Sequence, residues 1–211
     1  DGVFSMDGDI CHLPAIVNLA KEHGALVMVD DAHATGVIGE GKGTAHHYGL
    51  SDDVDIQLGT LSKALGSEGG YVCANEVIIN TLINHSRSFI FSTALVPAAV
   101  GAAKVALQLL KKEPYHIAQL RDNVHDMSKD LERHNIPVAH HAIPIFPIIV
   151  GSDEKALEVS EKLFEKGIIL TAIRPPTVAQ GQSRLRLTVT ADHTKEDLWY
   201  VADTLAEALK D

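Results

Sequence analysis

The chain has 211 residues, of which 45% are hydrophobic, so it is long enough and apolar enough to bury a substantial core. Its formal net charge is −10 and its longest basic run is Lys111–Lys112, which argues against a nucleic-acid partner. Its apolar runs are far shorter than the roughly 20 residues that span a membrane. Two cysteines, Cys11 and Cys73, cannot form a disulfide framework. We therefore expect a folded cytoplasmic protein that uses neither nucleic acid nor a membrane.

The first part of the sequence alternates helical and strand patterns. In chain order we predict a helix, a strand buried on both faces, two shorter strands and a second helix, over residues 13–23, 25–29, 55–59, 70–74 and 76–85. The first helix carries Ile16, Leu19 and Ala20 on one face. This alternation is typical of an α/β domain with a mostly parallel sheet, in which binding sites lie at the carboxyl ends of the strands.

The remaining sequence changes in character near residue 112. Residues 97–112 are apolar nearly all round and predict a buried helix, and a more polar helix follows over 115–134. Strands are then predicted at 143–150, 168–172 and 184–190, the last with one exposed face, and helices at 153–166 and 194–209. The last helix begins at a capping-box pattern, Thr194 to Asp197. We expect two domains, residues 1–111 and a small α+β domain of residues 112–211.

Two carboxylates and an imidazole, Asp30, Asp31 and His33, follow the first predicted strand. Open α/β sheets bind ligands at such strand ends, although similar residues also serve only to cap turns. A metal site is less favoured, because an Asp and a His in one turn supply at most two ligands. The adjacent pairs His46–His47 and His140–His141 do not share a face and are expected on the surface. We expect no metal.

A lysine among small residues, Lys63, follows the second predicted strand. Surroundings of low dielectric favour the neutral, nucleophilic form of an amine, although a lone lysine in a loop is usually just solvated. Together, Lys63 and Asp30 suit pyridoxal phosphate, since the lysine can form a Schiff base and the carboxylate can keep the pyridine nitrogen protonated. The glycine-rich run 36–43 lacks the Ser or Thr of a P-loop, and no Gly-x-Gly-x-x-Gly opens a helix, so neither a nucleoside triphosphatase nor a Rossmann oxidoreductase is favoured.

Four segments in this order along the chain, 1–9, 28–36, 59–63 and 184–188, resemble the α-oxoamine synthases, which are fold-type I pyridoxal-phosphate enzymes. The resemblance extends over the whole chain. It implies that residues 1–111 form the C-terminal part of a large cofactor-binding domain. Because members of this family are longer, we expect the chain to lack a phosphate-binding loop and a ring-stacking histidine, and to be inactive alone.

The resemblance also implies a role for individual residues in the cofactor site. Lys63 is the Schiff-base lysine, and Asp30 is the partner of the pyridine nitrogen. His33 and Ser5 bind the phenolic oxygen of the cofactor, and Thr60 binds its phosphate. Lys63, His33 and Asp30 are the catalytic residues in this interpretation, although Thr60 and Ser5 could also merely satisfy backbone groups of turns.

Further residues are implied to bind substrates or a second subunit. Ser92 and Thr93 reach the cofactor phosphate of a neighbouring subunit, which makes a homodimer the expected assembly. Arg186 binds the carboxylate of the amino acid, and Thr177 lies in the acyl-substrate site. Arg184 points to the same face of its strand as Arg186, so the sequence alone does not decide which of them binds a carboxylate.

The implied activity is a decarboxylating condensation of an amino acid with an acyl-CoA. The segment 172–178 is similar to the branch of the family that acts in biotin biosynthesis, which implies L-alanine and pimeloyl-CoA as substrates. One alternative keeps the cofactor and uses glycine and acetyl-CoA. A second alternative is a non-catalytic fragment or partner subunit, against which the presence of both Lys63 and Asp30 argues.

Overall fold

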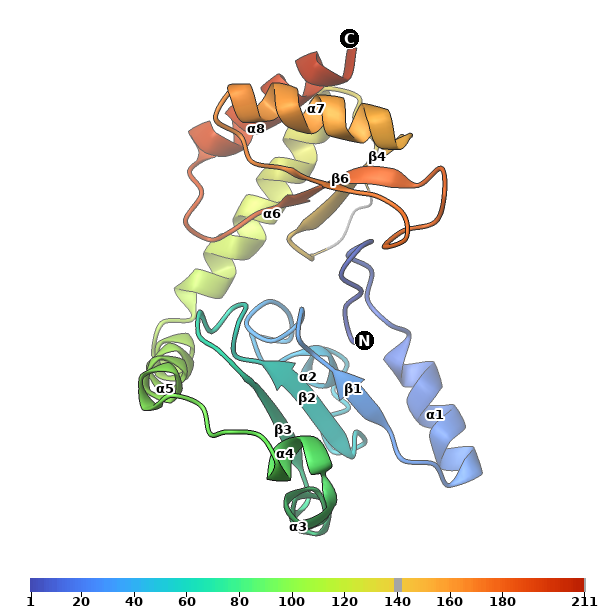
Figure 1. The fold of residues 1–211 in the computed structure, drawn as a ribbon, viewed down its shortest axis with the longest axis vertical. Coiled ribbons are helices and arrows are strands. Elements are labelled where there is room, and N and C mark those ends of the chain that lie inside the picture. Colours follow the sequence, from blue (N-terminus) through green and yellow to red (C-terminus); the bar gives the residue numbers. More distant parts are fainter. Residues whose placement is uncertain (139–141, 211) are drawn as a thin grey trace. The chain divides into compact units, whose positions relative to one another are not determined.

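The computed structural model describes residues 1–138 and 142–210 (Figure 1), so the expectation for His140–His141 lies outside the described residues. The chain divides into two compact units, the first made of Asp1–Phe4 and Ile10–Ile117 and the second of Ser5–Asp9 and Ala118–Asp211. This division differs from the expected one at residues 111 and 112. The boundary falls inside helix α6 (Tyr115–Arg133), and a short N-terminal segment belongs to the second unit.

The first unit contains a three-stranded sheet of order β1-β2-β3, formed by Met28–Asp30, Ile56–Thr60 and Gly70–Ala74. β1 and β2 are parallel, with Asp30 opposite Leu58, whereas β2 and β3 are antiparallel. The described part of this sheet therefore contains one parallel and one antiparallel pair of strands. β1 is shorter than the predicted strand because its pairing with β2 begins only at Met28. The preceding residue, Val27, accepts hydrogen bonds from the backbone N of Asp55 and of Ile56 through its carbonyl oxygen.

The helices of the first unit are α1 (Leu13–His23), α2 (Thr44–His47), α3 (Glu76–His85), α4 (Arg87–Ile90) and α5 (Pro97–Lys112). α1, α3 and α5 have the predicted bounds, but the apolar faces of α1 and α5 are buried less than expected. α1 buries Leu13 and Val17, while Ile16 and Leu19 are 49% and 57% exposed. α5 buries only Ala103. The physical reason is that the described part of this unit packs around a small core at the other face of α1.

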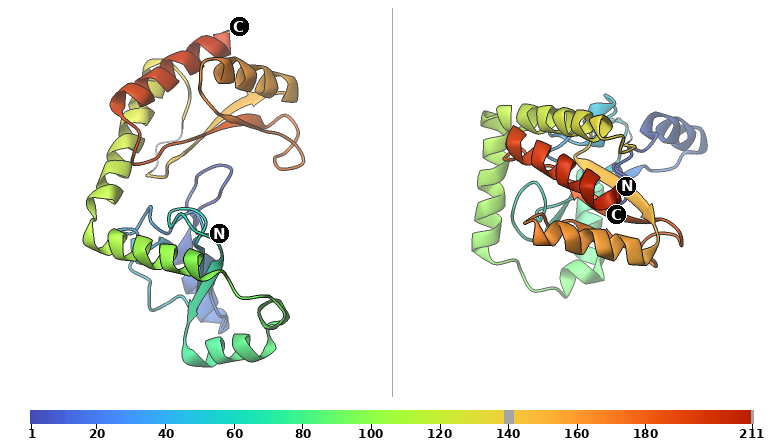
Figure 2. Two further views of the ribbon diagram at one scale, coloured as in Figure 1. Left: turned by 60° about the vertical axis from the view of Figure 1, so that its left-hand side comes forward. Right: turned by 90° about the horizontal axis from the view of Figure 1, so that it is seen from above.

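The second unit contains an antiparallel sheet of order β4-β6-β5, formed by Ile145–Gly151, Ser183–Thr188 and Thr171–Ile173. Three helices, α6, α7 (Asp153–Glu165) and α8 (Lys195–Lys210), cover one face of this sheet (Figure 2). Alternate residues of β4 and β6 point into the core against these helices: Phe146, Ile148, Leu185 and Leu187. β6 lies between the other two strands. Because side chains alternate along a strand, Arg184 and Arg186 lie on the face opposite Leu185 and Leu187.

The predicted capping box at the start of the last helix is confirmed. Backbone N of Thr194 donates to Asp197 Oδ2 at 2.9 Å, and backbone N of Asp197 donates to Thr194 Oγ1 at 3.1 Å, which is the reciprocal bonding of a capping box. Leu198, Ala202 and Leu205 are buried on one face, as predicted. Over the described ranges 1–138 and 142–210, no helix combines the length and the apolar character needed to cross a membrane.

Candidate active site

Asp30 ends β1 at the carboxyl edge of the first unit's sheet. Because its register partner on the parallel strand β2 is Leu58, the chain leaves both strands at the same edge, and Thr60 ends β2 there. Asp30 Oδ1 accepts a hydrogen bond from the backbone N of Ala32 at 2.8 Å, which turns the chain toward His33. No ion pair of Asp30 is found among the described residues. Its other carboxylate oxygen is therefore available to a cationic donor.

Asp31, the next residue, is buried, with 3% of its surface exposed. Its carboxylate Oδ2 accepts the backbone N of Thr44 at 2.9 Å, and its backbone N donates to Leu58 O at 2.7 Å. Its carbonyl oxygen accepts the backbone N–H groups of Ala34 and Thr35, at 3.0 and 2.9 Å. Burial raises the pKa of the Asp31 carboxyl above its ordinary value. Sequence reasoning noted this carboxylate but assigned it no role.

Three segments meet at the Asp31 carboxylate. Any Cβ at Gly2 would overlap Oδ1 of Asp31, and any Cβ at Gly43 would overlap Oδ2. Only glycine therefore allows these two segments to approach so closely. The hydrogen bond from Thr44 to the buried Asp31 holds the turn that carries Asp30 and His33, and these two residues are themselves partly exposed.

Lys63 is exposed in the loop that follows β2, and no ion pair of its amine is found among the described residues. Thr60, in contrast, uses its hydroxyl within the same loop. It donates to Gly69 O at 3.1 Å and accepts the backbone N of Ser62 at 3.2 Å. Lys63 is thus exposed to solvent, and the hydroxyl of Thr60 stabilises the loop in which it lies.

Tyr71 on β3 is a residue that sequence reasoning missed. Its hydroxyl lies 3.0 Å from the hydroxyl of Thr35, and it links β3 to the turn that contains His33. Any Cβ at Gly59 would overlap the Tyr71 ring, so only a glycine at this position of β2 leaves space for the tyrosine side chain. The signal in the sequence was a glycine within a strand, which often marks the close approach of another group.

Ser92 and Thr93, expected to reach a neighbouring subunit, are both exposed. The hydroxyl of Ser92 donates to Ser88 O at 2.5 Å and so closes the turn after α4. No contact of either side chain with Asp30 or Lys63 is seen in the described part of the first unit.

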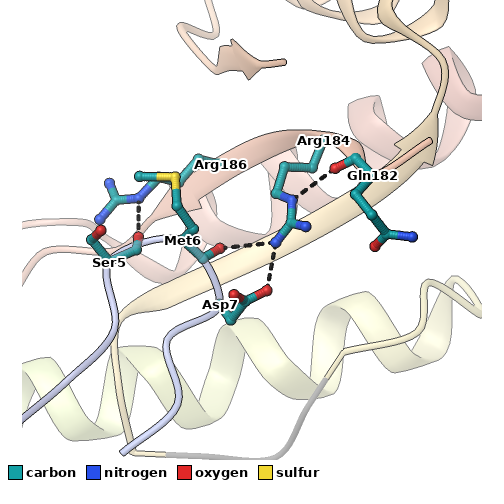
Figure 3. Close-up of polar contacts among 6 residues, drawn as sticks. All are labelled: Ser5, Met6, Asp7, Gln182, Arg184 and Arg186. Carbon is teal, nitrogen blue, oxygen red and sulfur yellow. Dashed lines mark hydrogen bonds and ion pairs between the residues drawn. The ribbon is translucent and has the colours of Figure 1, made fainter. Parts of the chain in front are cut away.

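In the second unit, Arg184 is buried beneath the segment Ser5–Asp9 (Figure 3). Its Nη1 lies 2.5 Å from Asp7 Oδ1 and also donates to Met6 O at 3.3 Å. Its Nε donates to Gln182 O at 3.0 Å. The predicted exposed face of this strand is thus wrong at Arg184, because a segment distant in sequence covers it.

Arg186, two residues further on the same face, has different surroundings. Its Nε donates to Ser5 O at 2.7 Å (Figure 3). Its Nη1 donates to Thr188 Oγ1 at 3.1 Å. Its cross-strand neighbours, Pro147 and Thr171, are uncharged, and no carboxylate pairs with it among the described residues. Burial lowers the pKa of the Arg186 guanidinium. Among the described residues, Arg184 is thus paired with a carboxylate and Arg186 is not.

Thr177 lies in the connection between β5 and β6, just after the cis peptide bond Pro175–Pro176. Its backbone N donates to Arg174 O at 3.1 Å, and the residue is exposed. Its predicted place in an acyl-substrate site stays a prediction.

The described structure contains a cavity in each unit. The cavity of the first unit, of about 460 Å³, is lined by Leu58, Gly59 and Tyr71. One of about 460 Å³ in the second unit is lined by Leu187, Val189, His193 and Tyr200, on the helical side of the sheet and opposite the arginines. Among residues 1–138 and 142–210, no group of three or more His, Cys, Asp or Glu side chains is arranged to hold a metal ion.

The sequence matches the aminotransferase class I and II family over residues 1–205. The chain belongs to this family. It is 49% identical over 199 residues to the 8-amino-7-oxononanoate synthase of Lysinibacillus sphaericus, covering 94% of this chain and 51% of that protein. The 8-amino-7-oxononanoate synthase 1 of Bacillus subtilis (strain 168) is 43% identical over 212 residues, covering all of this chain and 54% of that protein. The chain thus spans about half the length of these curated relatives.

Solved structures agree with this assignment. The serine palmitoyltransferase of Sphingomonas wittichii superposes with a TM-score of 0.93 at 30% identity, over 98% of this chain and 53% of that one. The 8-amino-7-oxononanoate synthase of Francisella tularensis superposes with a TM-score of 0.84 at 29% identity, over 99% of this chain and 61% of that one. These matches confirm the predicted α/β fold class, the resemblance to the α-oxoamine synthases and, for the family, pyridoxal phosphate as cofactor.

Proposed function

We propose that the protein to which this chain belongs condenses L-alanine with pimeloyl-CoA and releases 8-amino-7-oxononanoate, CoA and carbon dioxide. The support from similarity is a set of relatives named 8-amino-7-oxononanoate synthase. The structural observation that carries the proposal is the partly buried guanidinium of Arg186, which lacks a carboxylate among the described residues and suits the carboxylate of an amino acid.

Pyridoxal phosphate fits the residues at the edge of the first unit's sheet. Among the described residues, one carboxylate oxygen of Asp30 has no ion-pair partner, which suits a protonated ring nitrogen. Lys63 offers an exposed primary amine, which suits an aldehyde carbon. His33 is proposed to bind the phenolic oxygen of the cofactor and Thr60 its phosphate. Ser5, which belongs to the second unit, is proposed as a second partner of the phenolic oxygen. When bound, the cofactor acts as an electron sink that makes the Cα–H bond of the amino acid acidic.

In this proposal, Arg186 and Lys63 have different roles in the reaction. Arg186 holds the carboxylate of alanine, which orients the Cα–H bond. The amine of Lys63 removes the Cα proton as general base. The carbon so formed attacks the thioester carbonyl of pimeloyl-CoA: a carbon–carbon bond forms, the carbon–sulfur bond breaks and the CoA thiolate leaves. Loss of the original carboxylate as carbon dioxide follows, and Lys63 returns a proton to Cα.

Three further residues take proposed roles outside this sequence of steps. Thr177 is placed in the acyl-substrate site, in keeping with its exposed position after β5. Ser92 and Thr93 are placed against the cofactor phosphate of a second subunit in a homodimer, in keeping with their exposure. Sedimentation of the complete enzyme checks the dimer, and co-expression of a Thr93→Ala subunit with a Lys63→Ala subunit checks whether active sites are shared.

The central test is Lys63→Ala in the complete enzyme. We expect turnover to fall by at least about 10³-fold, because both the covalent partner of the cofactor and the general base are lost. The visible absorbance of the lysine-bound cofactor should also disappear. Lys129→Ala, which removes an exposed lysine of α6, is the matched control and should leave both unchanged. Normal turnover with normal absorbance in Lys63→Ala would contradict the proposal.

Substrate choice needs a separate measurement, since the residues around Lys63 suit glycine and acetyl-CoA equally well. We expect CoA release to be faster with alanine and pimeloyl-CoA than with glycine and acetyl-CoA. The reverse order would move the proposal to the second substrate pair. A complete protein that binds no pyridoxal phosphate in an absorbance titration would instead indicate a non-catalytic role.

A further inference from the structure

Arg184 has a buried charge that the proposed reaction does not use. Its side chain is only 6% exposed, and its cross-strand neighbours, Ile149 and Ile173, are apolar. A guanidinium in such surroundings is strongly destabilising unless it is paired and its N–H groups are bonded. Asp7 supplies the opposite charge, and the carbonyl oxygens of Met6 and Gln182 accept two further bonds, from Nη1 and Nε. The guanidinium of Arg184 thus binds other groups of the protein.

The partner of Arg184 is a segment that also contacts Arg186. Asp7 and Ser5 both lie in the five-residue segment Ser5–Asp9, which is separated from β6 by more than 170 residues of sequence. Arg184 holds this segment at Asp7, and the carbonyl of Ser5 takes the Nε–H of Arg186 (Figure 3). The two arginines therefore grip one segment at two points, two residues apart.

The bond to Ser5 decides how Arg186 is oriented. A guanidinium is planar, so a bond from Nε to Ser5 O and a second bond from Nη1 to Thr188 Oγ1 define the direction of the whole fork. The second terminal nitrogen, Nη2, has no bonding partner among the described residues. If the Ser5–Asp9 segment shifted, the acceptor of Nε would shift with it, and the fork would lose its fixed direction.

We propose that Arg184 is a positioning residue for carboxylate recognition: its ion pair with Asp7 clamps the Ser5–Asp9 segment to β6, and the clamped segment aims the guanidinium of Arg186 at the carboxylate of the amino acid. The inference rests on the proposed role of Arg186. It assigns the two arginines of one strand face to different tasks, one holding the protein and the other holding the substrate.

The test compares the affinity of the complete, cofactor-loaded enzyme for L-alanine with its affinity for L-alaninamide, which lacks the carboxylate charge. Both dissociation constants are measured by titration of the cofactor's absorbance. We expect Asp7→Asn to lower the preference for alanine by about tenfold, because a loosened fork retains only part of its charge-assisted bonding. Arg184→Gln should lower it at least as much, and Arg184→Lys, which keeps the charge, should recover part of it.

Two kinetic readouts distinguish positioning from general damage. The KM for alanine should rise in Asp7→Asn, while the KM for pimeloyl-CoA should change little. The melting temperature should also fall, because the variant leaves the buried guanidinium of Arg184 without its counter-charge, so the difference between the two KM values is the readout of positioning. Arg133→Gln is the matched control. It removes another Arg–Asp ion pair of the second unit, that of Arg133 with Asp130 on α6, and should leave the preference for alanine unchanged.

The outcomes separate this inference from the proposed function. If Arg186→Gln abolishes the preference for alanine but Asp7→Asn and Arg184→Lys leave it intact, the clamp is wrong and the role of Arg186 stands. If Arg186→Gln itself leaves the preference intact, the proposed carboxylate site is wrong. Should Arg184→Gln fail to fold, Asp7→Asn decides the question, because it retains the neutral acceptor and changes only the charge.

Discussion

The two units of this chain bury their apolar residues to very different extents. Among the described residues, eighteen buried hydrophobic side chains form the core of the second unit, but only seven form the core at α1 and β1 in the first. α8 buries the face that its sequence pattern predicts, whereas α1 and α5 leave much of their apolar surface exposed. The difference shows that an amphipathic pattern identifies the face that is suited to burial, while the packing of other elements decides whether it is covered.

The largest expected effect tests the core of the second unit. Leu185→Ala should lower the free energy of unfolding by about 2–5 kcal/mol, because Leu185 is fully buried on the central strand and its removal leaves a cavity. Val29→Ala in the smaller core of the first unit should cost less, about 2 kcal/mol. Urea denaturation measures both. Leu157→Ala, at a 46% exposed position of α7, is the control and should cost less than about 0.5 kcal/mol.

A second prediction concerns the two arginines of β6. Arg186→Gln should raise the KM for alanine by about 100-fold, since a charge-assisted, bidentate contact with the substrate is lost. Its melting temperature should stay close to that of the wild type, because no ion pair of the protein is broken. Arg184→Gln should instead lower the melting temperature, since it leaves Asp7 without its buried partner. Equal losses of stability in both variants would contradict the division between them.

A third prediction concerns the pH dependence of stability at Asp31. Its pKa in the folded protein lies above the ordinary value of 3.8, so the folded state binds the proton more tightly than the unfolded state does. Its contribution to stability is therefore present at pH below about 3.8 and is lost as the pH rises through the folded pKa. Asp31→Asn removes this titration while keeping an acceptor for Thr44. The variant should gain stability relative to the wild type as the pH rises from about 4 to 7.

Urea denaturation of both proteins at several pH values measures this difference. Asp53→Asn, which removes a surface carboxylate paired with Lys21, is the control and should not show the same trend. A wild type that gains stability relative to Asp31→Asn with rising pH would contradict the assignment of a raised pKa.

The smallest predicted effect is at the start of α8. Thr194→Ala should lower the free energy of unfolding by about 1 kcal/mol, because it removes the acceptor of the Asp197 N–H group. Asp197→Ala should cost a similar amount, and the double variant should cost less than the sum of the two, since each loss breaks the same reciprocal cap. Additive losses would show that the two residues act separately.

Much of the fold followed from local patterns. The bounds of α1, α3 and α5 and of β3 are as predicted, because capping residues and periodicity are local properties of the chain. Strand bounds such as those of β1 and β5 were less accurate, since pairing in the ladder depends on residues elsewhere in the sequence. The same limit applied to the site. Asp30 and His33 could be identified from their position after a strand, but neither the link from Tyr71 to Thr35 nor the bracing of the turn by Asp31 could be.

The sequence by itself determined which chemical groups are present and in what order they follow the strands: a carboxylate and an imidazole after β1, a lysine after β2, and two arginines on one face of β6. Only the tertiary structure decided which of the two arginines is paired with a carboxylate. Strand alternation places Arg184 and Arg186 on the same face, so the sequence does not distinguish them. The carboxylate that neutralises one of them lies 177 residues away in sequence, so folding alone brings it to Arg184 and leaves Arg186 without a carboxylate partner among the described residues.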